Sequence, residues 1–380
     1  MVATQLQAVR RQLGYKASEV ITMLLRRAHS LDIPVMTATS LKTKLSVWEN
    51  GRERVSEPYQ RLFREIYGRT SSELGFPTEN EDTDADELRS RLTLARSVDA
   101  ETVAAFRQQV ENARHVDRRF GGITLLDQLR SQIEQVKNLL DYSTISTHRA
   151  ALAGALTEAS TLAGWEALDR NALGQAWTHY ETAKTAAREA GSPGLLAHAA
   201  AEQALVLIDL GETTQAAEQL AHARALADDS ASPLLGAWLA AAHGEGLAAL
   251  GDRDNALRAF DTAGAGLPEN PQDPTLPFIF LGGSHLDRWR GNALAKLGEP
   301  DAIDQLTDVL ARVPGEFTRA KLGTLVDLAF AHAAAGDRDA AQHFARQARR
   351  VASQIKSDRQ LRRLGKLIYP GSPQALREVM

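Results

Sequence analysis

The chain has 380 residues, enough for two or three domains, and a formal net charge of −4. This charge is unevenly divided: residues 1–76 carry 12 Lys and Arg against 7 Asp and Glu, a balance of +5, so the remainder carries −9. A basic N-terminal part on an acidic body indicates that only the former meets a polyanion such as DNA. Cysteine is absent, which excludes disulfides, thiolate metal sites and cysteine nucleophiles.

No apolar segment is long enough to span a bilayer, because uninterrupted apolar runs are as short as the one at 204–208. Arg10 and Arg11 interrupt the N-terminal region before any apolar stretch typical of a secretory signal. We therefore expect a cytoplasmic protein without a membrane segment.

Four helices are predicted at the start of the chain, over about 4–13, from about Ser18, over 41–49 and over 58–67. Pro34 disfavours helix in the residue before it, so residues 31–39 should interrupt the second and third helices. Pro58 suits the first turn of the fourth helix.

The third of these helices carries the strongest functional signal. Leu41, Leu45 and Trp48 recur at helical spacing and should form a buried stripe. The helix should end at Gly51, because glycine readily adopts the left-handed backbone conformation. Its other face carries small polar and cationic side chains of the kind that read base edges and phosphates, although the same pattern would also fit an ordinary solvated helix.

The motif Leu45-Ser46-x-Trp48-Glu49-Asn50-Gly51, followed by Arg52-x-Arg54, resembles the Cro/repressor-type (XRE) helix-turn-helix family. The segment from Tyr59 to Phe76 resembles the form fused to tetratricopeptide repeats in actinobacterial regulators. The resemblance implies double-stranded DNA as partner and a homodimer. It implies base-reading roles for Lys42, Thr43, Ser46 and Val47, and phosphate contacts from Lys44, Asn50, Arg52 and Arg54.

An insertion at about 29–39 departs from the tight turn of that family. It could be a second DNA contact, a dimer contact or a plain loop.

An acidic run over 79–87 is predicted to be a solvated linker, with a DNA-mimicking tail as the alternative. We place the helix-turn-helix domain at 1–77, the acidic linker at 78–87, a helical connector at 88–149 and a repeat domain at 150–380. The apolar stripes of the connector fit packing within the chain or, alternatively, a self-association seam.

Beyond residue 150 the sequence repeats. The segment 249–256 recurs as 334–341, and alanines aligned with its last position stand at a spacing of about 40 residues. These aligned alanines are Ala176, Ala216, Ala256, Ala302 and Ala341. Gly244 and Phe260 match the glycine and aromatic positions of a tetratricopeptide repeat. Stacked helix pairs are therefore expected, in an all-α protein with a tetratricopeptide-like solenoid.

The first helices of such pairs would line a concave groove suited to a peptide or small-molecule effector. Groove candidates are Trp165, His198, Leu205, Trp238, Glu245, His285, Asp287 and Arg288. The tryptophans could equally pack between repeats, and the row of His285, Arg288 and Asn292 could be a solvated face. No lysine or arginine clamp is expected on this face, which disfavours anionic ligands.

Enzyme signatures are missing, and His198 with Glu202 lacks a third ligand for a metal, so neither an enzyme, a metal nor a cofactor is expected. We predict a sequence-specific DNA-binding transcriptional regulator whose repeat domain binds an effector or dimerises. A plasmid or phage maintenance protein, and a tetratricopeptide scaffold without direct gene regulation, are the alternatives.

Overall fold

The computed structural model describes residues 4–31, 33–76, 81–122, 125–227, 231–271, 273, 276, 278–282 and 284–369. These residues form helices and connecting loops with no strand among them, so the predicted all-α class is confirmed. The chain divides into two compact units: the head unit, residues 1–98 and 134–145, and the repeat unit, residues 99–133 and 146–380. Among the described helices none is long and apolar enough to cross a membrane.

The head unit is helical, and its first four helices surround one apolar core. Its helices are α1 (Gln5–Gln12), α2 (Ala17–Ser30), α3 (Ala38–Glu49), α4 (Glu57–Tyr67), α5 (Glu81–Arg96) and the second half of α7 (Leu125–Tyr142). The predicted stripe of Leu41, Leu45 and Trp48 is buried in this core. The Trp48 ring centroid lies 4.9 Å from that of Tyr59, so α3 and α4 are held together by aromatic packing.

The interruption before α3 occurs as predicted, since residues 33–37 are not helical. Tyr59 fixes this segment to α4, because its hydroxyl accepts a hydrogen bond of 2.7 Å from the Met36 backbone. The helix end is also as predicted: Gly51 has a φ of +67°, a left-handed conformation.

The acidic run differs from the expected linker. Helix α5 already begins at Glu81, while residues 77–80, including Glu79 and the expected domain boundary, lie outside the described residues. The helix is supported at Arg91, which pairs with Glu87 one turn earlier at 3.0 Å and donates to the Tyr142 hydroxyl at 3.1 Å. The expected connector 88–149 is thus shared between the two units.

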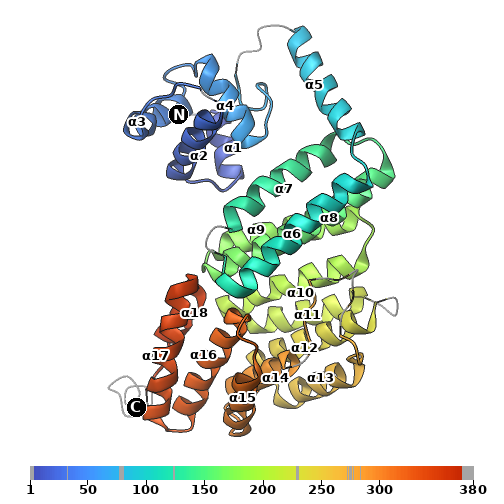
Figure 1. Ribbon diagram of the computed structural model, residues 1–380, viewed down its shortest axis with the longest axis vertical. Helices are drawn as coiled ribbons and strands as arrows, with labels where there is room; N and C mark the ends of the chain where they lie inside the picture. The colour runs from blue at the N-terminus through green and yellow to red at the C-terminus, as the bar shows by residue number, and fades with distance from the viewer. Residues whose placement is uncertain are drawn as a thin grey trace. The chain divides into compact units, whose positions relative to one another are not determined.

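The repeat unit is a stack of helix pairs (Figure 1). Its helices are α6 (Ala100–Phe120), the first half of α7, α8 (Ser146–Asp169), α9 (Leu173–Glu189), α10 (Pro193–Leu210), α11 (Thr213–Ala227), α12 (Pro233–Leu250), α13 (Arg253–Gly266), α14 (His285–Leu297), α15 (Asp301–Arg312), α16 (Thr318–Ala334), α17 (Arg338–Ile355) and α18 (Asp358–Gly365). Each helix from α8 onward packs on its successor to form five pairs, which is the predicted tetratricopeptide-like solenoid.

The repeat register rests on small residues. All five aligned alanines lie on the second helix of their pair and are 0% exposed. A Cβ at Gly164 would meet the Tyr180 ring at 2.8 Å, and one at Gly244 would meet the Phe260 ring at 2.8 Å. The aromatic side chain therefore fills the space that each glycine leaves between the paired helices.

The two ends of the solenoid meet. Helix α16 contacts α6, and α18 contacts α8, so that the inner helices enclose a space instead of an open groove. The connector stripes are not buried throughout, because Phe120 at the end of α6 is 59% exposed.

Candidate functional site

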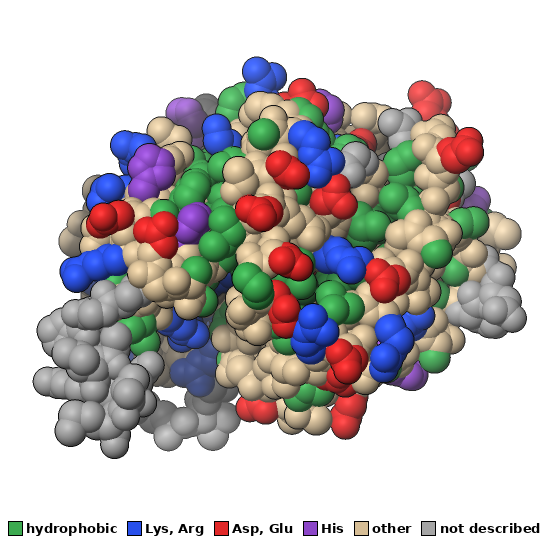
Figure 2. All heavy atoms as spheres, turned by 90° about the horizontal axis from the view of Figure 1, so that it is seen from below, with side chains coloured by type: hydrophobic (Ala, Val, Ile, Leu, Met, Phe, Trp, Pro, Cys, Tyr) green, Lys and Arg blue, Asp and Glu red, His purple; other side chains and the backbone are tan. Residues whose placement is uncertain are grey.

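A cavity of about 650 Å³ lies inside the repeat unit. It is lined by side chains of α6, α8, α10, α12, α14, α16 and α18, together with the segment 278–280. This volume falls within the range of about 300–1,000 Å³ that is typical of small-molecule and peptide pockets. The outer surface differs: on the face in Figure 2, acidic and basic side chains alternate without a region of one sign.

Aromatic side chains form one wall of the cavity. The His198 ring lies 4.8 Å from Trp238 and 4.4 Å from Phe278, and Trp238 meets Trp289 edge-on at 5.7 Å between centroids. Trp238 is only 5% exposed, so it packs between repeats and also lines the cavity. Both sequence-based interpretations of Trp238 therefore hold. The wall favours an apolar or aromatic ligand group.

The expectation that this face lacks lysine and arginine is wrong. Of the described residues, nine lysine and arginine side chains line the cavity against six carboxylates. They come largely from α6 and α18, which lie outside the predicted repeats, and from the first turn of α16. Anionic ligands are therefore favoured by the local charge.

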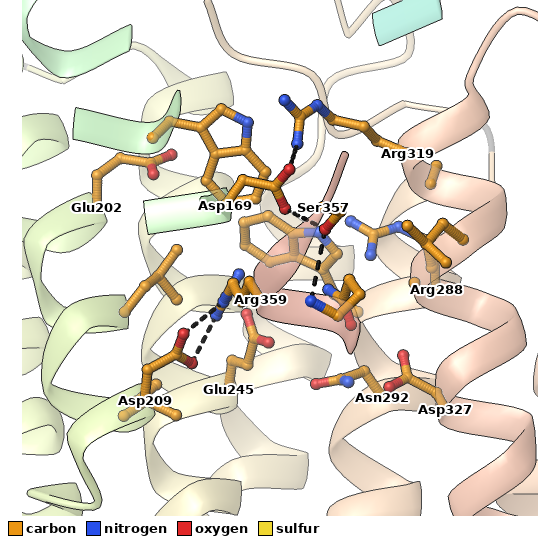
Figure 3. A pocket seen from close by; sticks show the side chains of 18 of the residues that line it. Asp169, Glu202, Asp209, Glu245, Arg288, Asn292, Arg319, Asp327, Ser357 and Arg359 are labelled. Carbon is orange, nitrogen blue, oxygen red and sulfur yellow. Dashed lines mark hydrogen bonds and ion pairs between the residues drawn. The ribbon is translucent and has the colours of Figure 1, made fainter. Parts of the chain in front are cut away.

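Most of these cations are already paired. Arg319 of α16 contacts Asp117 of α6 and both Glu166 and Asp169 of α8, the Glu166 carboxylate at 3.0 Å. Arg359 of α18 holds Asp209 of α10 in a bidentate pair at 2.5 and 2.9 Å (Figure 3). These pairs join the C-terminal helices of the repeat unit to α6, α8 and α10 across the cavity.

Two further contacts connect Ser357, which precedes α18, and Arg363 in the last turn of α18 to acidic residues of other helices. The Ser357 hydroxyl donates to Asp169 at 2.6 Å, and Arg363 pairs with Asp327 at 2.8 Å. Burial lowers the pKa of Arg319, but the carboxylates of Asp117, Asp169 and Glu166 more than reverse this, so the pKa is raised overall.

Arg288 differs from the other arginines. Of the described arginines that line the cavity, it is the one that makes no hydrogen bond or ion pair, and its Nε is buried without a partner. One turn later on α14, the buried Asn292 has an unpartnered Oδ1. A buried donor and a buried acceptor are thus left unsatisfied side by side on one helix.

The sequence-predicted groove residues mostly meet in this cavity. Those that line it are Trp165, His198, Leu205, Trp238, Glu245, His285 and Arg288. Asp287 is not among the lining residues, and its carboxylate pairs with Arg312 at 2.9 Å. The residues that sequence reasoning missed are the arginines of α6 and α18, which no repeat pattern covers, and Arg319 in the first turn of α16.

Glu202 and His198 are neighbouring buried groups in the cavity wall, with His198 Nε2 3.8 Å from the carboxylate. Burial raises the pKa of Glu202 to about 7, and it lowers the pKa of His198 to about 3. The Tyr180 hydroxyl donates to Glu202 at 3.4 Å. Both groups are therefore largely neutral over a mildly acidic range. Among the described residues, no three metal-ligating side chains gather in one place.

We expect Glu202→Gln to change the pH dependence of stability. The pKa of Glu202 in the folded chain exceeds its ordinary value of 4.5, so its contribution is fully present below that pH and is lost as the pH rises through about 7. The free energy of unfolding of the wild type, relative to the variant, should fall by about 3 kcal/mol over this window. Urea unfolding across the window measures it; a pH-independent difference would contradict the assignment.

The head unit presents the predicted DNA-facing residues on α3 and the loop after it. Lys42, Thr43 and Ser46 are exposed, as are Arg52 and Arg54, and Val47 is half-buried. Two expected phosphate ligands are engaged within the chain instead. Lys44 pairs with Glu53 at 2.6 Å, and the Asn50 amide donates to the Ser46 carbonyl at 2.6 Å, where it caps the helix.

Sequence reasoning missed an ion pair in the core of the head unit. Glu49, only 4% exposed, accepts two hydrogen bonds from Arg10, at 2.5 and 2.8 Å. Arg10 also donates to the Tyr15 carbonyl at 2.9 Å. Arg10 and Glu49 therefore fix α3 on α1.

No protein-family model matches this sequence, and no curated protein matches it. Among solved structures, it is similar to a crystal structure of a Rap protein complexed with competence and sporulation factor. The two chains are 14% identical with a TM-score of 0.46, and the similarity covers 91% of this chain and 99% of the other.

Proposed function

We propose that the protein is a ligand-binding regulator whose repeat unit encloses a short peptide. The observation that carries this proposal is the cavity of about 650 Å³, with an aromatic wall and an excess of cations. Its size is sufficient for a small ligand, and its walls combine apolar surface with a few polar groups that would orient it. The sequence contains none of the enzyme motifs that would make catalysis the better explanation.

Capture from a pool of short synthetic peptides tests this function. The full chain is incubated with the pool, separated by gel filtration and analysed for retained peptide by mass spectrometry. Leu205→Trp serves as the control. Leu205 is a half-buried residue of the cavity wall, so a larger side chain at this position would occupy the space needed by the ligand. Retention by the wild type and not by this variant is expected. Equal retention by both would place the binding elsewhere.

We further propose that the head unit binds double-stranded DNA, which would make the protein a transcriptional regulator. Two observations favour this function over a pure scaffold: the positive balance of residues 1–76, and the exposed side chains of Lys42, Thr43, Arg52 and Arg54 around one helix. Helix-turn-helix proteins commonly bind two half-sites as dimers, so we also propose a homodimer on DNA.

Arg52→Ala and Thr43→Ala should weaken DNA binding in different ways. Loss of the Arg52 charge should reduce affinity for all sequences and lower the slope of log K against log salt by about one, since one phosphate contact is removed. Loss of the Thr43 side chain should relax sequence preference by about 1–3 kcal/mol with an unchanged slope. Fluorescence anisotropy at two salt concentrations separates them, and identical behaviour of the two variants would contradict the proposed roles.

A further inference from the structure

We propose that Arg288 and Asn292 form a carboxylate subsite that takes the free C-terminus of the bound peptide. This inference rests on the proposed ligand-binding function of the cavity and specifies which end of the ligand is recognised. Both residues stand on α14 and line the cavity. In Figure 3 they lie on the side opposite Glu202 and Asp209.

The guanidinium of Arg288 has an unused hydrogen-bond donor that an anion could accept from. Its Nε is buried and has no partner, whereas the other arginines that line the described cavity, such as Arg359 and Arg363, already hold carboxylates or amides. The carboxylates of Glu245 and Asp327 act on it only through longer-range attraction, and Lys296 and Arg363 pair with those groups. A buried guanidinium N–H without a partner is costly, so a ligand anion would be stabilised here.

The unpartnered Oδ1 of the neighbouring Asn292 favours a ligand with a hydrogen-bond donor next to its anionic group. Residues four apart on a helix share one face, so its unpartnered Oδ1 lies one turn from the guanidinium. The last residue of a peptide carries a carboxylate and, next to it, a backbone N–H. The carboxylate would accept from Arg288 while the N–H donates to Asn292.

The number of free cations favours a carboxylate over a phosphate group. A phosphate group carries up to two negative charges and is usually held by several donors. Arg288 supplies one unpaired charge inside the cavity, which matches a single carboxylate, and Lys366, the other described lining cation without a hydrogen bond or ion pair, is exposed. The adjacent Trp289, in edge contact with Trp238, supplies apolar surface for the terminal side chain.

The probe for this test is the tripeptide N-acetyl-Ala-Leu-Phe with a free C-terminus, compared with the same peptide as its C-terminal amide. Binding to the full chain is measured by isothermal titration calorimetry. The free acid should bind at least about tenfold more tightly than the amide, because one charge-assisted bidentate pair is lost in the amide. Arg288→Gln should reduce binding of the acid to the level of the amide and leave the amide unaffected. Asn292→Leu should weaken both forms.

Arg118→Gln is the matched control, because Arg118 lines the cavity but pairs with Glu111 at 3.0 Å. It should have little effect on the preference for the acid. Equal binding of acid and amide would overturn the carboxylate subsite, as would an equal loss in both arginine variants or no binding of the acid at millimolar concentration. Equal binding that Leu205→Trp abolishes would refute this subsite alone and leave the cavity as the ligand site.

Discussion

Arg319→Gln should lower the free energy of unfolding by about 3–5 kcal/mol at neutral pH, because it leaves buried carboxylates without their cation. The Arg319 side chain is 12% exposed, and its partners Asp117, Glu166 and Asp169 are 7%, 1% and 6% exposed. Glutamine retains hydrogen-bonding capacity and much of the volume, so the effect would report the missing charge.

The loss should shrink at acidic pH. In the variant, loss of the Arg319 cation would raise the pKa of Glu166 further, so this carboxylate would be neutralised at higher pH than in the unfolded chain. Burial already raises the pKa of Glu166 well above its ordinary value in the wild type. Urea unfolding at acidic and neutral pH measures both effects.

Arg312→Gln is the control for Arg319. Its partner Asp287 is 45% exposed and the arginine itself 53% exposed, so the expected change is within about 1 kcal/mol. A similar small change for Arg319→Gln would show that its ion pairs do not hold the ends of the solenoid together.

Glu49→Gln should destabilise the head unit by about 3–5 kcal/mol, since it leaves the Arg10 guanidinium buried without a compensating charge. The Arg10 side chain is 14% exposed and that of Glu49 5% exposed. Because the chain divides into two units, a single unfolding transition is not assured. Hydrogen exchange followed by mass spectrometry, on peptides from α1 and α3, therefore measures the effect in the full chain.

Lys44→Gln is the matched control on the same helix. The Lys44 side chain is 34% exposed and its partner Glu53 50% exposed, so α3 should keep its protection to within about 1 kcal/mol. We expect amide hydrogen exchange in α1 and α3 to be faster in Glu49→Gln than in the wild type, and to be unchanged in Lys44→Gln. Unchanged exchange in Glu49→Gln would contradict a structural role for the Arg10–Glu49 pair.

Local periodicity made much of the fold predictable. The alanines at 176, 216, 256, 302 and 341 mark the second helix of each pair, because only a small residue fits where two helices approach closely. The stripe of Leu41, Leu45 and Trp48 likewise identified the buried face of α3. Seven of the eight predicted groove residues line the cavity, because inner-face positions follow from the helical period.

The closure of the cavity could not be predicted in this way. Arg319 and Asp117 are 202 positions apart, and Arg359 and Asp209 are 150 apart. No periodic pattern relates such residues, since their pairing depends on how far the solenoid curves over five repeats. The prediction that no lysine or arginine lines the groove was wrong for the same reason, because most of these cations stand on α6, α16 and α18. That Arg288 has no partner can be seen only once its neighbours are placed.

The central claim is that the cavity of the repeat unit is the ligand site, and photo-crosslinking tests it most directly. A peptide retained from the pool is resynthesised with a photoreactive phenylalanine and irradiated with the full chain, and the modified residues are identified by mass spectrometry. We predict modification on the cavity-lining faces of α10, α12, α14 and α16, such as at Trp238 and Trp289, and its loss in Leu205→Trp. Modification confined to the outer helices α9, α11 and α13 would contradict the account.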